Sequence, residues 1–79
     1  MSTLHEFSRM DDIREKFGSR IKDLRIARGY SQEKLAEIAD LDRTYIPGIE
    51  NGKRNVSLVV IEKIAKAFNL TLSELLNDL

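Results

Sequence analysis

The chain has 79 residues, of which 42% are hydrophobic and 33% are charged, and its 13 basic residues balance 13 acidic ones. A chain of this length forms one domain with a small core, and a net charge of zero gives no hint of a polyanionic partner. The absence of cysteine excludes disulfides and thiolate metal sites.

Little in the chain favours an enzyme. The single histidine, His5, cannot form a metal cluster or a catalytic triad alone, and there is no phosphate-binding loop. We therefore expect no enzymatic activity, no metal and no cofactor. No apolar run approaches ~18 residues and the amino end lacks a basic-then-apolar signal, so we expect a cytoplasmic protein without membrane contact.

Helical periodicity runs through the chain, whereas strand signals are nearly absent. Residues 1–12 are expected to form an N-terminal extension, either an irregular start or an extra turn of the first helix, and residues 13–79 the domain. The first helix is expected to begin after Asp11 or Asp12 and to stop at Gly29. Its apolar face is Ile13, Phe17, Ile21 and Leu24.

Residues 31–52 predict two short helices joined by a tight turn. Ser31 is the expected cap of the first, which ends before a break at 40–41. The second is expected over residues 43–51, with Asp42 as its cap and with Ile46 and Ile49 facing inward. The small side chain of Ala36 lets the two helices cross closely. This is the helix-turn-helix pattern, in which the second helix presents its outer face to the DNA major groove.

Two further helices complete the prediction. Ser57 is the expected cap of a fourth helix, and Thr71 with Glu74 forms a capping box for a short fifth. The core face of the fourth helix is expected to be Leu58, Ile61, Ile64, Ala65 and Phe68. The fold class that follows is all-α: a compact five-helix bundle with a helix-turn-helix formed by helices two and three.

Residues 13–77 resemble the Cro and phage-repressor type of helix-turn-helix proteins. The positions shared with the broad family are Gln32, Ala36, Ile46, Glu50 and Gly52. Within it, the run LDRTYIPGIENGKRN before a helix starting Ser-Leu is most similar to the controller proteins of restriction–modification systems. These are small homodimeric transcription regulators. The resemblance implies sequence-specific binding to double-stranded DNA at palindromic operators and control of the protein's own promoter.

Activation would need a further contact, with RNA polymerase, through an acidic surface such as Glu33 or Glu37. Two departures from the family pattern stand out. Asp40 occupies a turn position where the family often has glycine, and aspartate tolerates a positive φ better than most residues. Pro47 and Gly48 fall inside the expected recognition helix, so we expect that helix to be kinked.

The residues expected to contact DNA fall into two groups. Base edges are expected to be read from the start of the recognition helix, above all by the guanidinium of Arg43, which matches guanine O6 and N7. For the Tyr45 side chain two roles are expected as alternatives: a contact with phosphate or sugar, or a position at the edge of the core. The base-reading group is Arg43, Thr44 and Tyr45. The backbone-contacting group is Ser31, Gln32, Asn51, Lys53, Arg54 and Asn55.

Two structural roles are also expected. The resemblance implies an ion pair between Arg25 and Glu50 that fixes geometry. The last two helices carry more apolar side chains than one small core can cover, which predicts C-terminal dimerisation helices. The expected dimer interface is Val59, Val60, Leu70, Leu72, Leu75 and Leu79.

Alternatives remain within and outside this class. A phage-type repressor or an antitoxin has the same fold, and a helical protein–protein interaction module is the alternative from a different class. Pro47 and the zero net charge favour that module. The evidence against the interaction module is the group of basic residues Arg43, Lys53 and Arg54.

Overall fold

Helix-capping residues set where most of the helices begin. The computed structural model describes residues 12–79, and in this range it contains α2 (Ile13–Ala27), α3 (Gln32–Ala39), α4 (Tyr45–Glu50), α5 (Leu58–Ala67) and α6 (Leu72–Leu75), without a strand. The caps of α2, α3, α5 and α6 are Asp12, Ser31, Ser57 and Thr71, each accepting a backbone N–H. The all-α class with five helices, and these four expected caps, are therefore confirmed.

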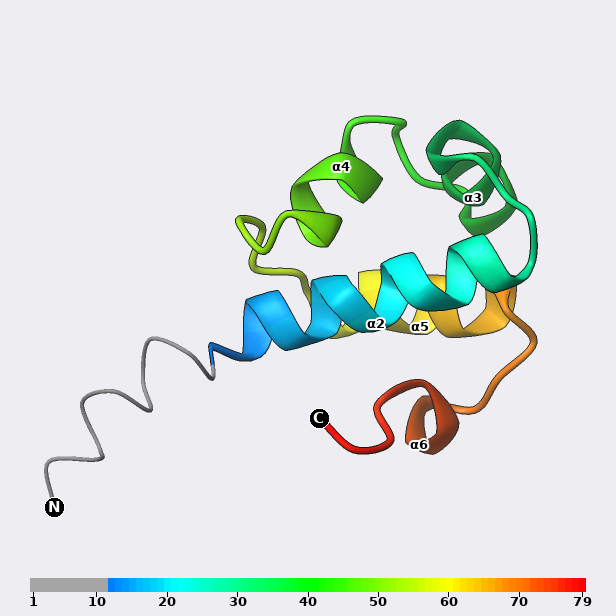
Figure 1. The fold of residues 1–79 in the computed structure, drawn as a ribbon. Helices are drawn as coiled ribbons and strands as arrows, with labels where there is room; N and C mark the ends of the chain where they lie inside the picture. The colour runs from blue at the N-terminus through cyan, green and yellow to red at the C-terminus, as the bar shows by residue number, and fades with distance from the viewer. Residues whose placement is uncertain (1–11) are drawn as a thin grey trace, which may run out of the picture.

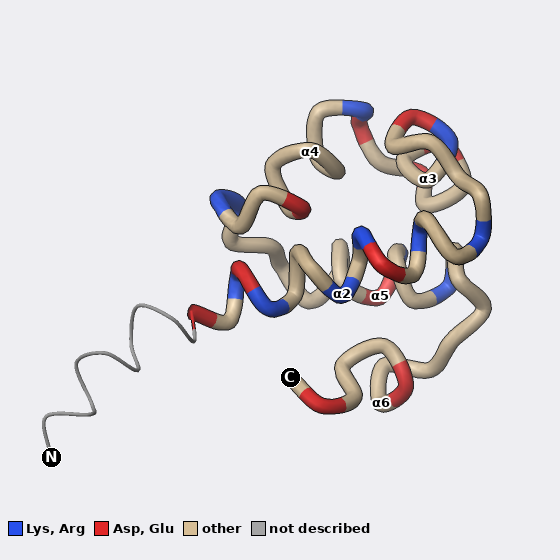
Figure 2. The backbone as a smooth tube through the Cα atoms, viewed as in Figure 1, with Lys and Arg blue, Asp and Glu red and all other residues tan. Residues whose placement is uncertain are grey.

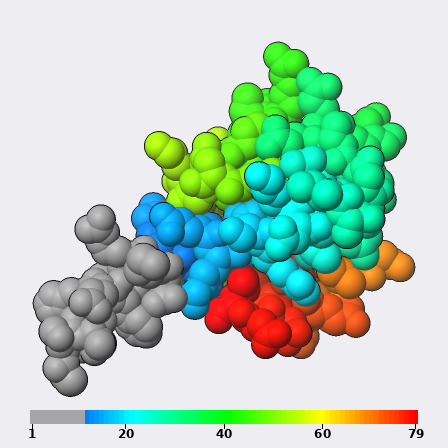
Figure 3. Space-filling view, viewed as in Figure 1, coloured from blue at the N-terminus to red at the C-terminus, as the bar shows by residue number. Residues whose placement is uncertain are grey.

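The helices are arranged on two sides of α2. In Figure 1, α3 and α4 lie on one side of α2 and the short α6 lies on the other. The space-filling view shows the same separation, with the green segment of α3 and α4 and the red carboxyl-terminal segment at opposite ends of the molecule (Figure 3). The expected N-terminal extension, His5 included, lies outside the described residues except for Asp12. Within residues 12–79, no helix is both long and apolar enough to cross a membrane.

One apolar core joins the five helices of residues 12–79. Its buried side chains are Phe17, Ile21, Leu35, Ala36, Ala39, Ile46, Ile49, Ile64, Ala65, Phe68 and Leu75. Two expected core residues are not part of it: Ile13 and Leu58 are 57% and 77% exposed. Both have the correct helical spacing, but each is the first residue of its helix, where the other described elements leave it largely uncovered.

Two arginines, Arg20 in α2 and Arg28 at its carboxyl cap, bond to other helices of the fold. Arg20 donates to the carbonyls of Glu74 and Leu75 at 2.7 and 3.0 Å, and Arg28 donates to the carbonyl of Phe68 at 3.0 Å. A cation near the last carbonyls of a helix also interacts favourably with the helix dipole. These arginines therefore hold the carboxyl-terminal ends of α5 and α6 against α2, which charge counting along the sequence did not reveal.

Candidate nucleic-acid interface

A left-handed residue forms the turn between α3 and α4. Asp40 has φ 59° and ψ 49°, and the N–H of Leu41 donates to the carbonyl of Ala36 at 2.8 Å. Aspartate tolerates this conformation, as the sequence led us to expect. Because Ile46 and Ile49 are buried, the opposite side of α4 faces outward.

The recognition helix begins later than predicted. The carboxylate of Asp42 accepts the N–H of Thr44 at 2.8 Å and its hydroxyl at 2.7 Å, which closes a turn before the helix. Hydrogen bonds from Thr44, first the backbone N–H and then the hydroxyl, lower the pKa of Asp42. The predicted helix over residues 43–51 is thus wrong at its start: Arg43 and Thr44 lie in this turn, and α4 begins at Tyr45.

Pro47 does not interrupt α4, and the expected kink stays a prediction. Pro47 is the third residue of α4, and the first-turn N–H groups of a helix have no acceptor within the helix. Proline therefore removes no hydrogen bond there, and α4 continues unbroken to Glu50. The N–H of Asn51 donates to the carbonyl of Pro47 at 3.1 Å, which continues the hydrogen bonding beyond it.

A largely buried ion pair fixes α4 on α2. Arg25 Nε and Nη2 donate to the two carboxylate oxygens of Glu50 at 2.6 and 3.0 Å. The side chains of Arg25 and Glu50 are only 13% and 5% exposed, and this hydrogen bonding raises the pKa of Arg25. Gln32 Nε2 donates to the same carboxylate at 3.1 Å, so α3 joins the cluster. Glu50 thus connects three helices, and the expected Arg25–Glu50 pair is present.

Arg54 is held beside α4 by Tyr45. The guanidinium carbon of Arg54 lies 4.1 Å from the centre of the Tyr45 ring, a cation–π arrangement. The backbone N–H of Arg54 donates to the carbonyl of Gly48 at 3.1 Å. The half-buried Tyr45 ring therefore flanks the core and orients Arg54.

Two polar hollows flank the exposed side of α4. The first, of about 480 Å³, is lined by Lys22, Arg25, Gln32, Pro47, Glu50 and Asn51. The second, of about 390 Å³, is lined by Gly48, Lys53, Arg54 and Asn55. Figure 2 shows basic residues at both ends of α4, while α6 and the carboxyl end carry only acidic charges. Lys22 joins this surface from α2, although no sequence motif marks it as a contact residue.

Several expected contact residues already have partners in the chain. Arg43 Nη1 lies 3.7 Å from the carboxylate of Glu33, with both side chains about three-quarters exposed. An exposed pair of this kind contributes little and leaves Arg43 available to a ligand. The hydroxyl of Ser31 caps α3, and the Asn51 side chain accepts the N–H of Lys53 at 3.1 Å.

The expected dimer residues divide into surface and core. Val59 and Leu72 are exposed, and the side chains of Val60, Leu70 and Leu79 are half-buried. The prediction that Leu75 belongs to the dimer interface is wrong. Its side chain is 0% exposed because α6 turns it into the core, so it cannot take part in an interface.

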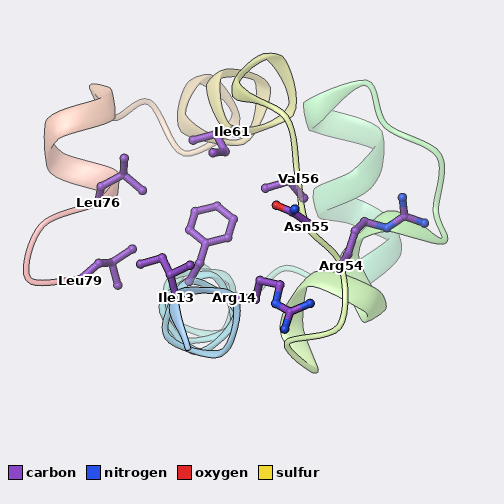
Figure 4. Close-up of a pocket in the computed structure, with 9 residues that line it drawn as sticks. Ile13, Arg14, Arg54, Asn55, Val56, Ile61, Leu76 and Leu79 are labelled. Atoms are coloured by element: carbon purple, nitrogen blue, oxygen red, sulfur yellow. The ribbon is translucent and has the colours of Figure 1, made fainter. Parts of the chain in front are cut away.

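One of these residues, Leu79, lines an apolar groove. It has a volume of about 230 Å³, and its apolar lining consists of Ile13, Phe17, Val56, Ile61, Leu76 and Leu79. Figure 4 shows Leu76 and Leu79 on one side of the groove, with Ile13 beside Leu79 and with Ile61 and Val56 across from them. No sequence pattern assigns Ile13 or Leu76 to a contact surface.

Known proteins share this sequence and this fold. A helix-turn-helix family model matches residues 21–75. The control protein C.MunI of Mycoplasma sp is 54% identical over 71 residues, covering 89% of this chain and 96% of C.MunI. The control protein C.BamHI of Bacillus amyloliquefaciens is 48% identical over 68 residues, covering 85% of this chain and 84% of C.BamHI.

Solved structures agree with these matches. The restriction–modification controller protein C.AhdI from Aeromonas hydrophila superposes with a TM-score of 0.75 and 52% identity, covering 78% of this chain and 94% of C.AhdI. The restriction–modification controller protein C.Esp1396I gives a TM-score of 0.74 and 36% identity, covering 84% and 88%.

Proposed function

The chain belongs to the helix-turn-helix family, in the branch of the restriction–modification control proteins, and from this we propose that it binds operator DNA and regulates transcription from its own promoter. The observation that carries the proposal is the exposed side of α4. Polar hollows flank it, and a buried ion pair holds it in a fixed orientation. A rigid helix with cationic neighbours suits insertion into the major groove.

The residues around α4 make two kinds of contact with DNA, to base edges and to phosphates. Arg43 and Thr44, in the turn before the helix, approach base edges, and Tyr45 acts through Arg54. Ser31 and Gln32 at the start of α3 contact phosphates, as do the residues after α4: Asn51, Lys53, Arg54 and Asn55. Of the two features that favour the rival interaction module, Pro47 does not interrupt α4, and the zero net charge is the other.

One pair of variants tests this division. We expect Arg43→Ala to reduce discrimination between operator and random duplex by about 1–3 kcal/mol. We expect Lys53→Ala to weaken binding to both duplexes alike and to lower the slope of log K against log salt by about one. Fluorescence anisotropy at several salt concentrations measures both effects. Equal loss of discrimination in the two variants would contradict the division.

The proposal includes a two-fold dimer in the cytoplasm, formed through the surface of Val59, Val60, Leu70, Leu72 and Leu79. A two-fold axis would place two copies of α4 about one DNA turn apart, which matches a palindromic operator. An activating contact with RNA polymerase belongs to the same proposal. In this proposal the polymerase contacts Glu33 and Glu37 on α3, whose side chains are largely exposed.

A charge placed on the dimer surface tests its role. We expect Val59→Asp to convert the dimer to a folded monomer, because Val59 is 61% exposed in the protomer and its replacement leaves the core intact. Analytical ultracentrifugation measures the mass and circular dichroism checks the fold. Ile26→Asp is the matched control, since Ile26 is a similarly exposed helical residue on α2. A dimeric Val59→Asp protein would place the interface elsewhere.

A further inference from the structure

Pro47 is an apolar group on an otherwise polar surface. It is exposed on α4 and lines the first hollow with Lys22 and Gln32. Gly48 follows it and lines the second hollow with Lys53. Pro47 therefore stands between the two hollows, where the proposed function places the DNA bases.

The fold does not require proline at this position. The side chain is exposed, so it fills no space in the core. The helix tolerates proline because first-turn N–H groups have no acceptor within the helix. The feature of Pro47 that the fold does not use is its ring, which presents a rigid hydrocarbon surface outward.

The chemistry of that ring limits what it can read. Proline has no backbone N–H and no polar side-chain atom, so it cannot form a hydrogen bond with a base edge through either. In the major groove, the apolar group that distinguishes one base from the others is the C5-methyl of thymine. Gly48 carries no side chain that would hold the DNA away from the ring.

We infer that Pro47 is a specificity-determining residue, whose ring contacts the C5-methyl group of one thymine in each half of the operator. This inference rests on the proposed function, because it requires α4 to enter the major groove. It adds an apolar contact from the middle of the exposed side of α4, whereas Arg43 and Thr44 lie in the turn before this helix.

Removing single methyl groups from the DNA tests the inference. A duplex is first selected from a random pool by the wild-type protein, and each thymine is then replaced in turn by deoxyuridine. We expect one substitution per half-site to weaken wild-type binding by about three- to five-fold, the size expected for losing one buried methyl group. In Pro47→Ser we expect the same duplexes to bind equally, whether they carry thymine or deoxyuridine at that position. In Pro47→Ala, whose one methyl group can still touch thymine, we expect a smaller loss than in the wild type.

Two controls separate this effect from a change in folding. Pro47→Ala changes an exposed side chain and removes no hydrogen bond of α4, so thermal unfolding should show little change in stability. Ile26→Ala, which removes an exposed apolar side chain from α2, should retain the wild-type sensitivity to deoxyuridine.

The possible outcomes keep the two claims apart. If the wild-type protein enriches no sequence, the proposed function fails. If it enriches a sequence but tolerates deoxyuridine at every position, the inference about Pro47 is wrong while the proposed function stands. The same conclusion follows if both Pro47 variants keep the wild-type sensitivity.

Discussion

Replacing Glu50 with alanine is expected to lower the free energy of unfolding by about 3–5 kcal/mol and to abolish operator binding. The carboxylate is 5% exposed and accepts hydrogen bonds from Arg25 and Gln32. Its removal leaves a largely buried guanidinium without its counter-charge. In a domain of this size the loss is a large fraction of the total stability. Urea denaturation followed by circular dichroism measures it.

A double-mutant cycle identifies the cause. Arg25→Ala combined with Glu50→Ala removes both charges, so we expect it to be less destabilising than the sum of the two single changes. Loss of DNA binding at an unchanged denaturation midpoint in Glu50→Ala would contradict the structural role. It would instead make Glu50 part of the DNA contact.

Gly18→Ala is expected to lower the free energy of unfolding by about 1–3 kcal/mol, although alanine is the better helix former. Gly18 is buried where α2 crosses α4, and a Cβ there would collide with the carbonyl oxygen of Ile49. Because the obstacle is backbone, α4 itself has to move. We therefore expect weaker operator binding as well, measured beside the denaturation midpoint.

Gly48→Ala is the matched control for Gly18→Ala. Gly48 is also a helical glycine, but a Cβ there would lie 3.4 Å from Nε of Arg54, at the far end of a flexible side chain. We expect this variant to be as stable as the wild type, or more stable by up to about 1 kcal/mol. Equal denaturation midpoints for the two variants would show that the close crossing of α2 and α4 is not needed.

Helix boundaries were predictable where a local side chain sets them. Ser31, Ser57 and Thr71 each cap the helix that the sequence assigned to them, because a cap depends only on residues two or three positions away. The start of α4 was not predictable in this way. Asp42 accepts a hydrogen bond from Thr44 and so forms a turn instead of capping a helix. Aspartate favours both turns and helix caps, so its presence does not decide between them.

Long-range roles were less predictable, because periodicity gives the direction of a side chain but not what covers it. Leu58 lies on the expected face of α5 yet remains exposed, whereas Leu75 is buried by α6. The need for glycine at position 18 depends on a backbone carbonyl more than thirty residues away. The carbonyls that accept from Arg20 and Arg28 are separated from these arginines by even more residues along the sequence. Of the site, the sequence predicted the helix-turn-helix, and its resemblance to the family implied the Arg25–Glu50 pair.

The most direct test of the proposed function compares two DNA duplexes. The wild-type protein is titrated against DNA from upstream of its own gene and against a scrambled duplex of equal composition, at two salt concentrations. We expect preferential binding to the upstream DNA, a shift of dimer size, and affinity that falls as salt rises. Equal and salt-insensitive binding to both duplexes, or no binding, would contradict the account and favour a protein partner.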